Sequence, residues 1–171
     1  MRIKCFASMI VLFVILIACP INAQQTRESN HPQHPSGVND RGDHAMGFSH
    51  DKTTHHFKLT ANGGAVEVSA NDPKDTGSRD RIRMHLSHIA ELFKEGDFSK
   101  PMFIHDKTPP GVPVMIQLKT EINYTFQETE QGARVRITTA NAKALAAIHE
   151  FLRFQIKDHE TGDSLEVTPD N

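Results

Sequence analysis

Cysteine is nearly absent from this chain of 171 residues, which has only Cys5 and Cys19. Both fall in an N-terminal region that the sequence predicts to be a secretion signal, so the mature chain keeps no thiol, or one acylated thiol. This excludes a disulfide scaffold, a cysteine nucleophile and a zinc site built on thiolates. The folded part must therefore be stabilised by its own core, and any metal site must use His, Met, Asp or Glu.

Enzyme motifs and an excess of basic residues are also lacking. The chain has no Gly-x-Ser-x-Gly elbow, no P-loop and no Gly-x-Gly-x-x-Gly run after a strand. Of the 19 basic residues, Arg2 and Lys4 lie in the signal region, which leaves 17 against 21 acidic residues. Phosphate binding needs a basic face, so nucleic acid is not an expected partner.

Residues 1–23 are typical of a secretory signal peptide. The apolar run 5–18 follows a short basic start and precedes small residues. This run is shorter than the roughly 20 apolar residues of a membrane-spanning helix. Cleavage after Ala23 would release a periplasmic or secreted protein without a transmembrane segment. Alternatively, the run that ends in Cys19 resembles a bacterial lipobox and would leave a lipid anchor there, although Pro20 favours the cut at Ala23.

Polar segments flank the expected domain. Residues 24–43 have Val38 as their one large apolar side chain, so they are predicted to be a flexible polar tether. Residues 164–171 are predicted to be a frayed tail. The region between them, residues 44–163, is expected to form a single α+β domain.

Alternation of apolar and polar residues predicts two β-hairpins. The first pairs residues 55–60 with 65–70 around a Gly-Gly turn, and the second joins the alternating stretches at 124–126 and 135–137. Each hairpin precedes a predicted helix, at 78–95 and at 142–158. The apolar residues at helical spacing in these two segments are Ile82, Leu86, Ile89 and Phe93, and Leu145, Ile148, Leu152 and Ile156.

The predicted fold is therefore α+β, with an antiparallel sheet made from two β-hairpin–helix units and helices packed on one face. Two segments lie between the units. Residues 102–105 are predicted to form a short strand, and residues 110–122, which open with proline, are predicted to form a helix.

Histidines are the most distinctive side chains, and all 11 lie after the signal region. Period-two alternation puts His55 on the helix-covered face of its strand. Helical spacing puts His85 at the edge of the first apolar stripe and His149 inside the second. These three are predicted to point toward the sheet–helix interface, and His88 and His105 are placed within reach of its margin.

Converging neutral imidazoles would form a site for zinc or copper. Thioethers would favour reduced copper, and the candidates are Met46, Met84, Met102 and Met115. The alternative is that each histidine is an ordinary polar group at the edge of the core, and that the methionines fill the core. Spacing fixes no carboxylate partner for a histidine base.

Four segments, TTHHFKL, IRMHLSHIAELF, TPPGVPVM and ALAAIHEFLRFQI, resemble an uncharacterised family of short exported bacterial proteins over about residues 45–163. The resemblance implies export and one compact domain, and it implies no activity. Some members carry the label aspartate carbamoyltransferase, which this sequence does not support. The chain lacks the Ser-Thr-Arg-Thr motif that binds carbamoyl phosphate and has roughly half the length that the two domains of that enzyme require.

Three functions from different classes remain. The leading prediction is an exported periplasmic binding or interaction module with a histidine-lined metal site. The alternatives are a small enzyme that uses a histidine as its base and a purely structural or partner-binding domain. The missing motifs favour a protein that is not an enzyme.

Overall fold

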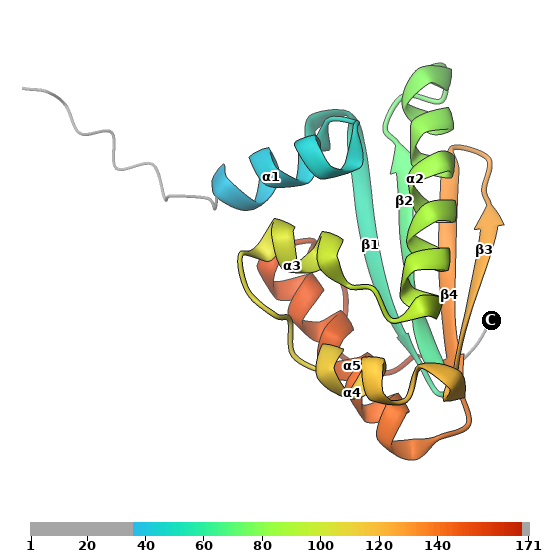
Figure 1. Ribbon diagram of the computed structural model, residues 1–171. Helices are drawn as coiled ribbons and strands as arrows, with labels where there is room; N and C mark the ends of the chain where they lie inside the picture. The colour runs from blue at the N-terminus through green and yellow to red at the C-terminus, as the bar shows by residue number, and fades with distance from the viewer. Residues whose placement is uncertain (1–35, 169–171) are drawn as a thin grey trace, which may run out of the picture. The chain divides into compact units, whose positions relative to one another are not determined.

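The computed structural model describes residues 36–168, which form an α+β domain (Figure 1). The predicted signal peptide, the lipid-anchor site at Cys19 and residues 24–35 of the predicted tether lie outside the described residues. The elements in chain order are α1 (Ser36–Met46), β1 (Thr53–Thr60), β2 (Gly63–Ala70), α2 (Thr76–Glu95), α3 (Ser99–His105), α4 (Val112–Gln117), β3 (Ile122–Glu128), β4 (Gly132–Thr139) and α5 (Ala142–Asp158). Two short 3₁₀ helices, His50–Lys52 and Lys119–Glu121, precede β1 and β3.

The four strands form one antiparallel sheet in the order β1-β2-β4-β3. The two hairpins therefore meet along β2 and β4 in the middle of the sheet. α2 packs on the half of the sheet that contains β3 and β4, and α5 packs on the half with β1 and β2 (Figure 1). The predicted antiparallel sheet of two hairpin–helix units is confirmed.

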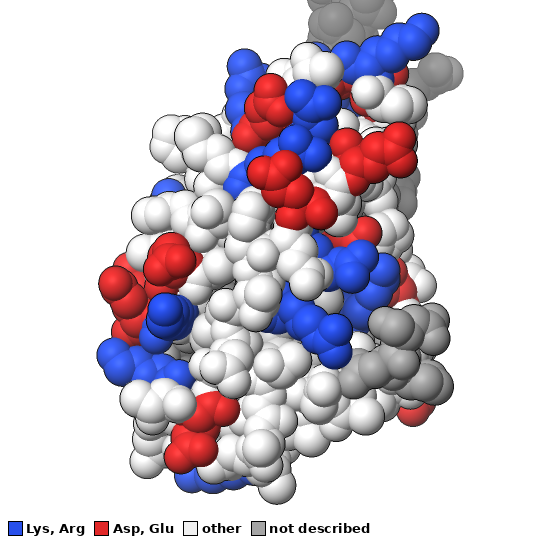
Figure 2. Space-filling view, turned by 90° about the vertical axis from the view of Figure 1, so that its right-hand side faces the viewer, with Lys and Arg blue, Asp and Glu red and all other residues white. Residues whose placement is uncertain are grey.

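Charged side chains pair with each other on the sheet face opposite the helices. The carboxylate of Glu67 accepts hydrogen bonds from Lys58 Nζ at 2.9 Å and from Arg134 Nε at 3.2 Å. On the side of the molecule drawn in Figure 2, basic and acidic side chains are interspersed. That side therefore has no large area of a single charge.

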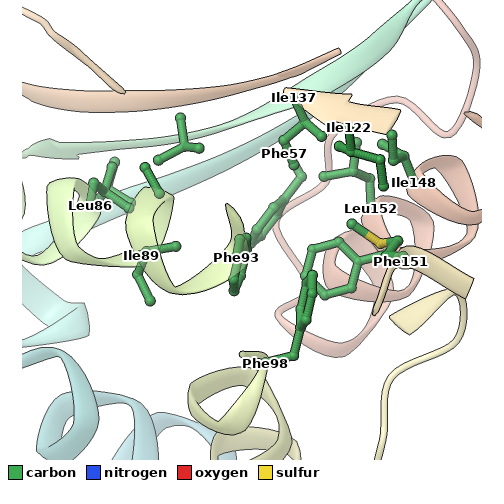
Figure 3. Close-up of a cluster of buried hydrophobic side chains, with 14 of the residues drawn as sticks. Phe57, Leu86, Ile89, Phe93, Phe98, Ile122, Ile137, Ile148, Phe151 and Leu152 are labelled. Atoms are coloured by element: carbon green, nitrogen blue, oxygen red, sulfur yellow. The ribbon is translucent and has the colours of Figure 1, made fainter. Parts of the chain in front are cut away.

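The core lies between the sheet and the helices. Phe57, Val66, Val135 and Phe126 are neighbours in one row across the four strands, and all four point toward the helices. The predicted stripe of α2 is buried along its whole length, and so is most of the stripe of α5. Within this core the rings of Phe93 and Phe98 stack on each other, and Phe151 meets both of them edge to face (Figure 3).

Capping residues fix the ends of the two long helices. The side chain of Asn141 accepts hydrogen bonds from two N–H groups in the first turn of α5. Asp75 does the same for α2. Gly96 ends α2 with φ 82°, a left-handed conformation that glycine adopts without strain.

The segment between the units differs from its prediction. Residues 102–105 belong to the helix α3, not to a strand, because a short apolar run does not distinguish the two by its period. The helix expected at 110–122 ends at Gln117, and β3 begins at Ile122. No helix in residues 36–168 is long and apolar enough to cross a membrane.

The predicted limits of the domain also need correction. Residues 36–43 were expected to belong to the flexible tether, but they form most of α1. This helix is held by tertiary contacts that composition does not reveal. Val38 is buried, and Arg41 Nε donates a hydrogen bond of 2.8 Å to the carbonyl oxygen of Ile104 in α3.

The segment after α5 covers the free edge of β1. Thr168 donates from its backbone N–H to the carbonyl oxygen of Leu59 at 2.9 Å, and it pairs in parallel with Thr60. Residues 164–168, predicted to be part of a frayed tail, are therefore attached to the sheet. This pairing covers backbone groups of an edge strand that would otherwise be open to pairing with another chain.

Candidate functional site

A small cavity lies between the sheet and helices α2, α3 and α5. Its volume is about 70 Å³, which is room for more than one water-sized group. Most of its lining is apolar. The exceptions are Lys100, Gln155 and four imidazoles, which come from four different parts of the chain: His55, His85, His105 and His159.

His55 reaches the cavity from β1. It stacks between Phe48 and His159, with ring centroids 6.2 and 6.0 Å away. Its Nε2 atom is closed off from solvent and has no hydrogen-bond partner in residues 36–168. Burial, followed by the neighbouring His85 imidazole, lowers the pKa of His55 to about 4. The ring is therefore neutral near pH 7 and has an unused nitrogen.

His85 and His159 resemble His55 in their aromatic neighbours and lowered pKa values, and both residues are partly exposed. His85 meets Phe48 edge to face at 5.7 Å, and His159 packs against Phe57 at 5.6 Å. Neither imidazole makes a hydrogen bond within the described part of the chain. Burial is the main cause that lowers the pKa of His85 to about 4 and that of His159 to about 3. Lys100 lowers the pKa of His85 further, and the neighbouring imidazoles of His55 and His105 lower that of His159.

His105 is buried and fully hydrogen-bonded. Its Nδ1 lies 2.6 Å from Asp158 Oδ2, and its Nε2 lies 2.9 Å from the side-chain amide of Gln155. The amide nitrogen of Gln155 is otherwise buried without a partner in residues 36–168. An amide turned with its NH₂ group toward His105 satisfies both groups, since Nδ1 then donates to the carboxylate and Nε2 accepts. Burial opposes ionisation of Asp158, but the interactions with His105 and Lys107 together outweigh it and lower the pKa of the carboxyl.

His149 lies elsewhere. Its Nε2 is 3.0 Å from the carbonyl oxygens of both Thr60 and Gly63, so it donates to the turn between β1 and β2. That turn is at the far end of β1 from His55, roughly 17 Å along the strand. The predicted convergence of His149 with His55 and His85 is therefore wrong. The position of His149 on α5 directs its side chain toward the turn, where it donates a hydrogen bond shared by two backbone carbonyl oxygens.

His88 is exposed on α2 and does not line the cavity. Of the five histidines predicted to form the site, the structure brings together His55, His85 and His105. His159, which the sequence pattern did not single out, is the fourth. It follows Ile156 by three positions, so continuing the buried stripe of α5 past its last helical residue would have found it.

Hydrogen bonding distinguishes His55, His85 and His159 from the other described histidines that are at least partly buried. His50 Nδ1 lies 3.0 Å from Asp43, and His56 Nδ1 donates to Asp163 at 2.8 Å. His105 and His149 also have polar partners. His55, His85 and His159 make no hydrogen bond in residues 36–168, and all three line one cavity. His44 and His88 also make none there, but both are exposed.

A second, more polar cavity of about 230 Å³ adjoins the first, between α1 and the start of β1. Its lining includes Asn39, His50 and Thr161. Only Met46, His55 and His159 line both cavities. These three side chains therefore form the boundary between a polar outer chamber and an apolar inner one.

The described side chains are not preset for a metal ion. In residues 36–168, no three His, Cys, Asp or Glu side chains are arranged to hold one. The imidazoles of the cavity would have to rotate toward a common point, about 2.0–2.1 Å from each nitrogen. Comparison of the chain with family models, with curated proteins and with solved structures finds no match.

Proposed function

We propose that this protein is an exported binding module that holds a metal ion, zinc or copper, in the histidine-lined cavity. His55, His85 and His159 supply the ligand nitrogens. The signal-like sequence of residues 1–23 supports export to the periplasm, with lipid attachment at Cys19 as the alternative. Mass spectrometry of the mature N-terminus distinguishes a chain that begins at Gln24 from one that carries an acylated cysteine.

One observation carries the metal proposal: the buried Nε2 of His55 has no hydrogen-bond partner in the described residues, and it shares its cavity with the imidazoles of His85 and His159. A buried ring nitrogen in a folded protein is normally paired, so the unpaired Nε2 of His55 beside two further imidazoles indicates a missing partner. Low pKa values keep these rings neutral, and neutral imidazole is the form that binds metal. Borderline cations such as zinc and copper suit this ligand type.

Calorimetric titration of the exported protein with zinc, copper(II) and copper(I) tests the proposal. We expect binding by the wild type that is lost in the triple variant His55→Ala, His85→Ala, His159→Ala. The matched control is His149→Ala, which removes an imidazole at the other end of β1. A further control, His31→Ala with His34→Ala, measures any binding by residues before the domain. No binding by the wild type, or binding lost only in this last variant, rejects the cavity site.

The second candidate is a small hydrolytic enzyme with His105 as its base. The contact of 2.6 Å between His105 Nδ1 and Asp158 favours it, because a carboxylate on Nδ1 orients an imidazole for proton transfer. Hydrolysis of an activated ester that depends on His105 and Asp158, and not on His85, would support this candidate. Equal rates in the wild type and in His105→Gln would reject it.

A further inference from the structure

Three residues mark the boundary between the inner and outer cavities: Met46, His55 and His159. We propose that they bind copper(I) in preference to zinc or copper(II), through the Met46 thioether and one ring nitrogen of each histidine. This inference rests on the proposed metal-binding function and specifies its ion. It replaces His85 by Met46 in the immediate coordination of the metal.

The charges around the boundary favour an ion of low charge. Among residues 36–168, no Asp or Glu lines either cavity, and Lys100 adds a positive charge to the inner one. Two carboxylates act electrostatically on the two boundary imidazoles, Asp43 on His55 and Asp158 on His159. Both are already hydrogen-bonded, to His50 and His105. The cost of moving an ion out of water rises with the square of its charge, so a divalent ion without an anionic ligand is penalised about fourfold more than a monovalent one.

The ligand types point the same way. Thioether sulfur is a soft ligand that selects copper(I), whereas zinc sites in proteins use thiolate, imidazole and carboxylate. Copper(I) binds stably with two or three ligands. It therefore does not need a preformed group of three His, Asp or Glu side chains, which residues 36–168 do not contain. His55 and His159 lie with their rings 6.0 Å apart and nearly parallel, within reach of an ion placed at their edges after rotation.

Met46 is placed to close the site from outside. It is the last residue of α1 and is half-buried against the core. Gly47 follows with φ 77°, and a side chain at that position would meet nothing within 4 Å. The end of α1 therefore has open space behind it and room to adjust as the thioether moves onto an ion in the outer chamber.

An anaerobic competition assay tests this proposal, with bicinchoninate as the competing copper(I) chelator and the exported protein as the binder. We expect the wild type to retain copper(I) at least tenfold more tightly than Met46→Leu, which keeps the volume of the side chain. The matched control is Met84→Leu on α2, where the methionine is 72% exposed. X-ray absorption of the copper(I) complex should show one sulfur neighbour that Met46→Leu lacks.

The outcomes separate the two proposals. Zinc binding that depends on the cavity histidines, without copper(I) binding, would overturn this inference and leave the proposed function standing. Copper(I) binding of equal strength in wild type and Met46→Leu, with only nitrogen neighbours, would also overturn it. Absence of binding by any of the three ions would reject both. Spectroscopy on the wild type keeps the test valid even where a variant fails to fold.

Discussion

The carboxylate of Asp163 accepts a hydrogen bond of 2.9 Å from the backbone N–H of Phe57, a residue in the edge strand β1. Its other oxygen accepts from His56 Nδ1. Burial opposes ionisation of Asp163, but these hydrogen bonds outweigh it and lower the pKa of the carboxyl. The contact therefore stabilises the fold when the carboxylate is charged. This stabilisation is lost as the pH falls below about 3.9, the ordinary pKa of an Asp side chain.

Replacing Asp163 by Ala should detach the segment that covers β1. Loss of a hydrogen-bonded, partly buried carboxylate is expected to lower the free energy of unfolding by about 1–3 kcal/mol at pH 7. Urea denaturation measures this, and hydrogen exchange should accelerate at the amide of Phe57. The exposed Glu166 gives the control variant Glu166→Ala. Unchanged exchange at Phe57 would contradict the role given to Asp163.

Replacing Leu152 by Ala tests the packing of α5 on the sheet. The side chain is fully buried and faces Gly64, where an added Cβ would lie 2.3 Å from Leu152 Cδ1. We expect a loss of about 2–5 kcal/mol in the free energy of unfolding, since the truncated side chain leaves a cavity. Lys157→Ala, at an exposed position of the same helix, should change it by less than about 0.5 kcal/mol.

Two glycines should respond in opposite ways to replacement by alanine. At Gly111 the backbone has φ 82°, and a Cβ would lie 2.1 Å from the carbonyl oxygen of Ala147 in α5. Gly111→Ala should therefore destabilise the fold by well over 1 kcal/mol. At Gly77, in the first turn of α2, the nearest atom is 3.5 Å away, so Gly77→Ala should be neutral or stabilise by up to about 1 kcal/mol. Thermal melts of both variants measure the contrast.

Tyr124 should resist ionisation in the folded protein. Its hydroxyl is buried without a partner in residues 36–168, and burial raises the pKa of this phenol well above its usual value of about 10. Because the unfolded chain ionises first, stability should be unaffected by this group below about pH 10 and should fall above it. The chain has one tyrosine and no tryptophan, so phenolate absorbance reports this residue alone.

At about pH 11, we expect phenolate absorbance in guanidinium chloride and little in native buffer. Tyr124→Phe should remove the fall in stability above about pH 10 and cost little at neutral pH, since its hydroxyl makes no hydrogen bond in the described structure. Full ionisation of Tyr124 in the native protein near pH 10 would show that its hydroxyl is open to solvent.

Periodicity was sufficient to predict the sheet and both long helices. The apolar stripe from Ile82 to Phe93 and the alternation around Phe57 each repeat several times, so the local pattern and the fold agree. It did not predict α1, whose polar residues gain their order from a few tertiary contacts such as that between Arg41 and Ile104. Nor did it identify α3, because the run at residues 102–105 that was predicted to be a strand is too short to define a period.

The candidate site was predictable only in part for the same reason. The two-residue alternation of β1 correctly predicted that His55 faces the helices. The helical spacing of α2 correctly placed His85 beside the apolar stripe. The direction in which a helical residue points does not determine which position along the neighbouring strand it will contact. His149 points toward the sheet as predicted, but it contacts the hairpin turn. His159, just beyond the end of α5, reaches the cavity instead.

The pairing of β2 with β4 has a consequence for the order of folding. Each hairpin closes through a short turn, so β1 with β2, and β3 with β4, can form in microseconds. The contact between Ser69 and Gly132 instead joins residues far apart in sequence and carries a much larger loop-closure entropy. We expect the slow step to be the docking of two preformed hairpin–helix units along this seam. In concentrated solution, the second unit of another molecule can dock there instead, which makes exchanged dimers the natural misassembly of this fold.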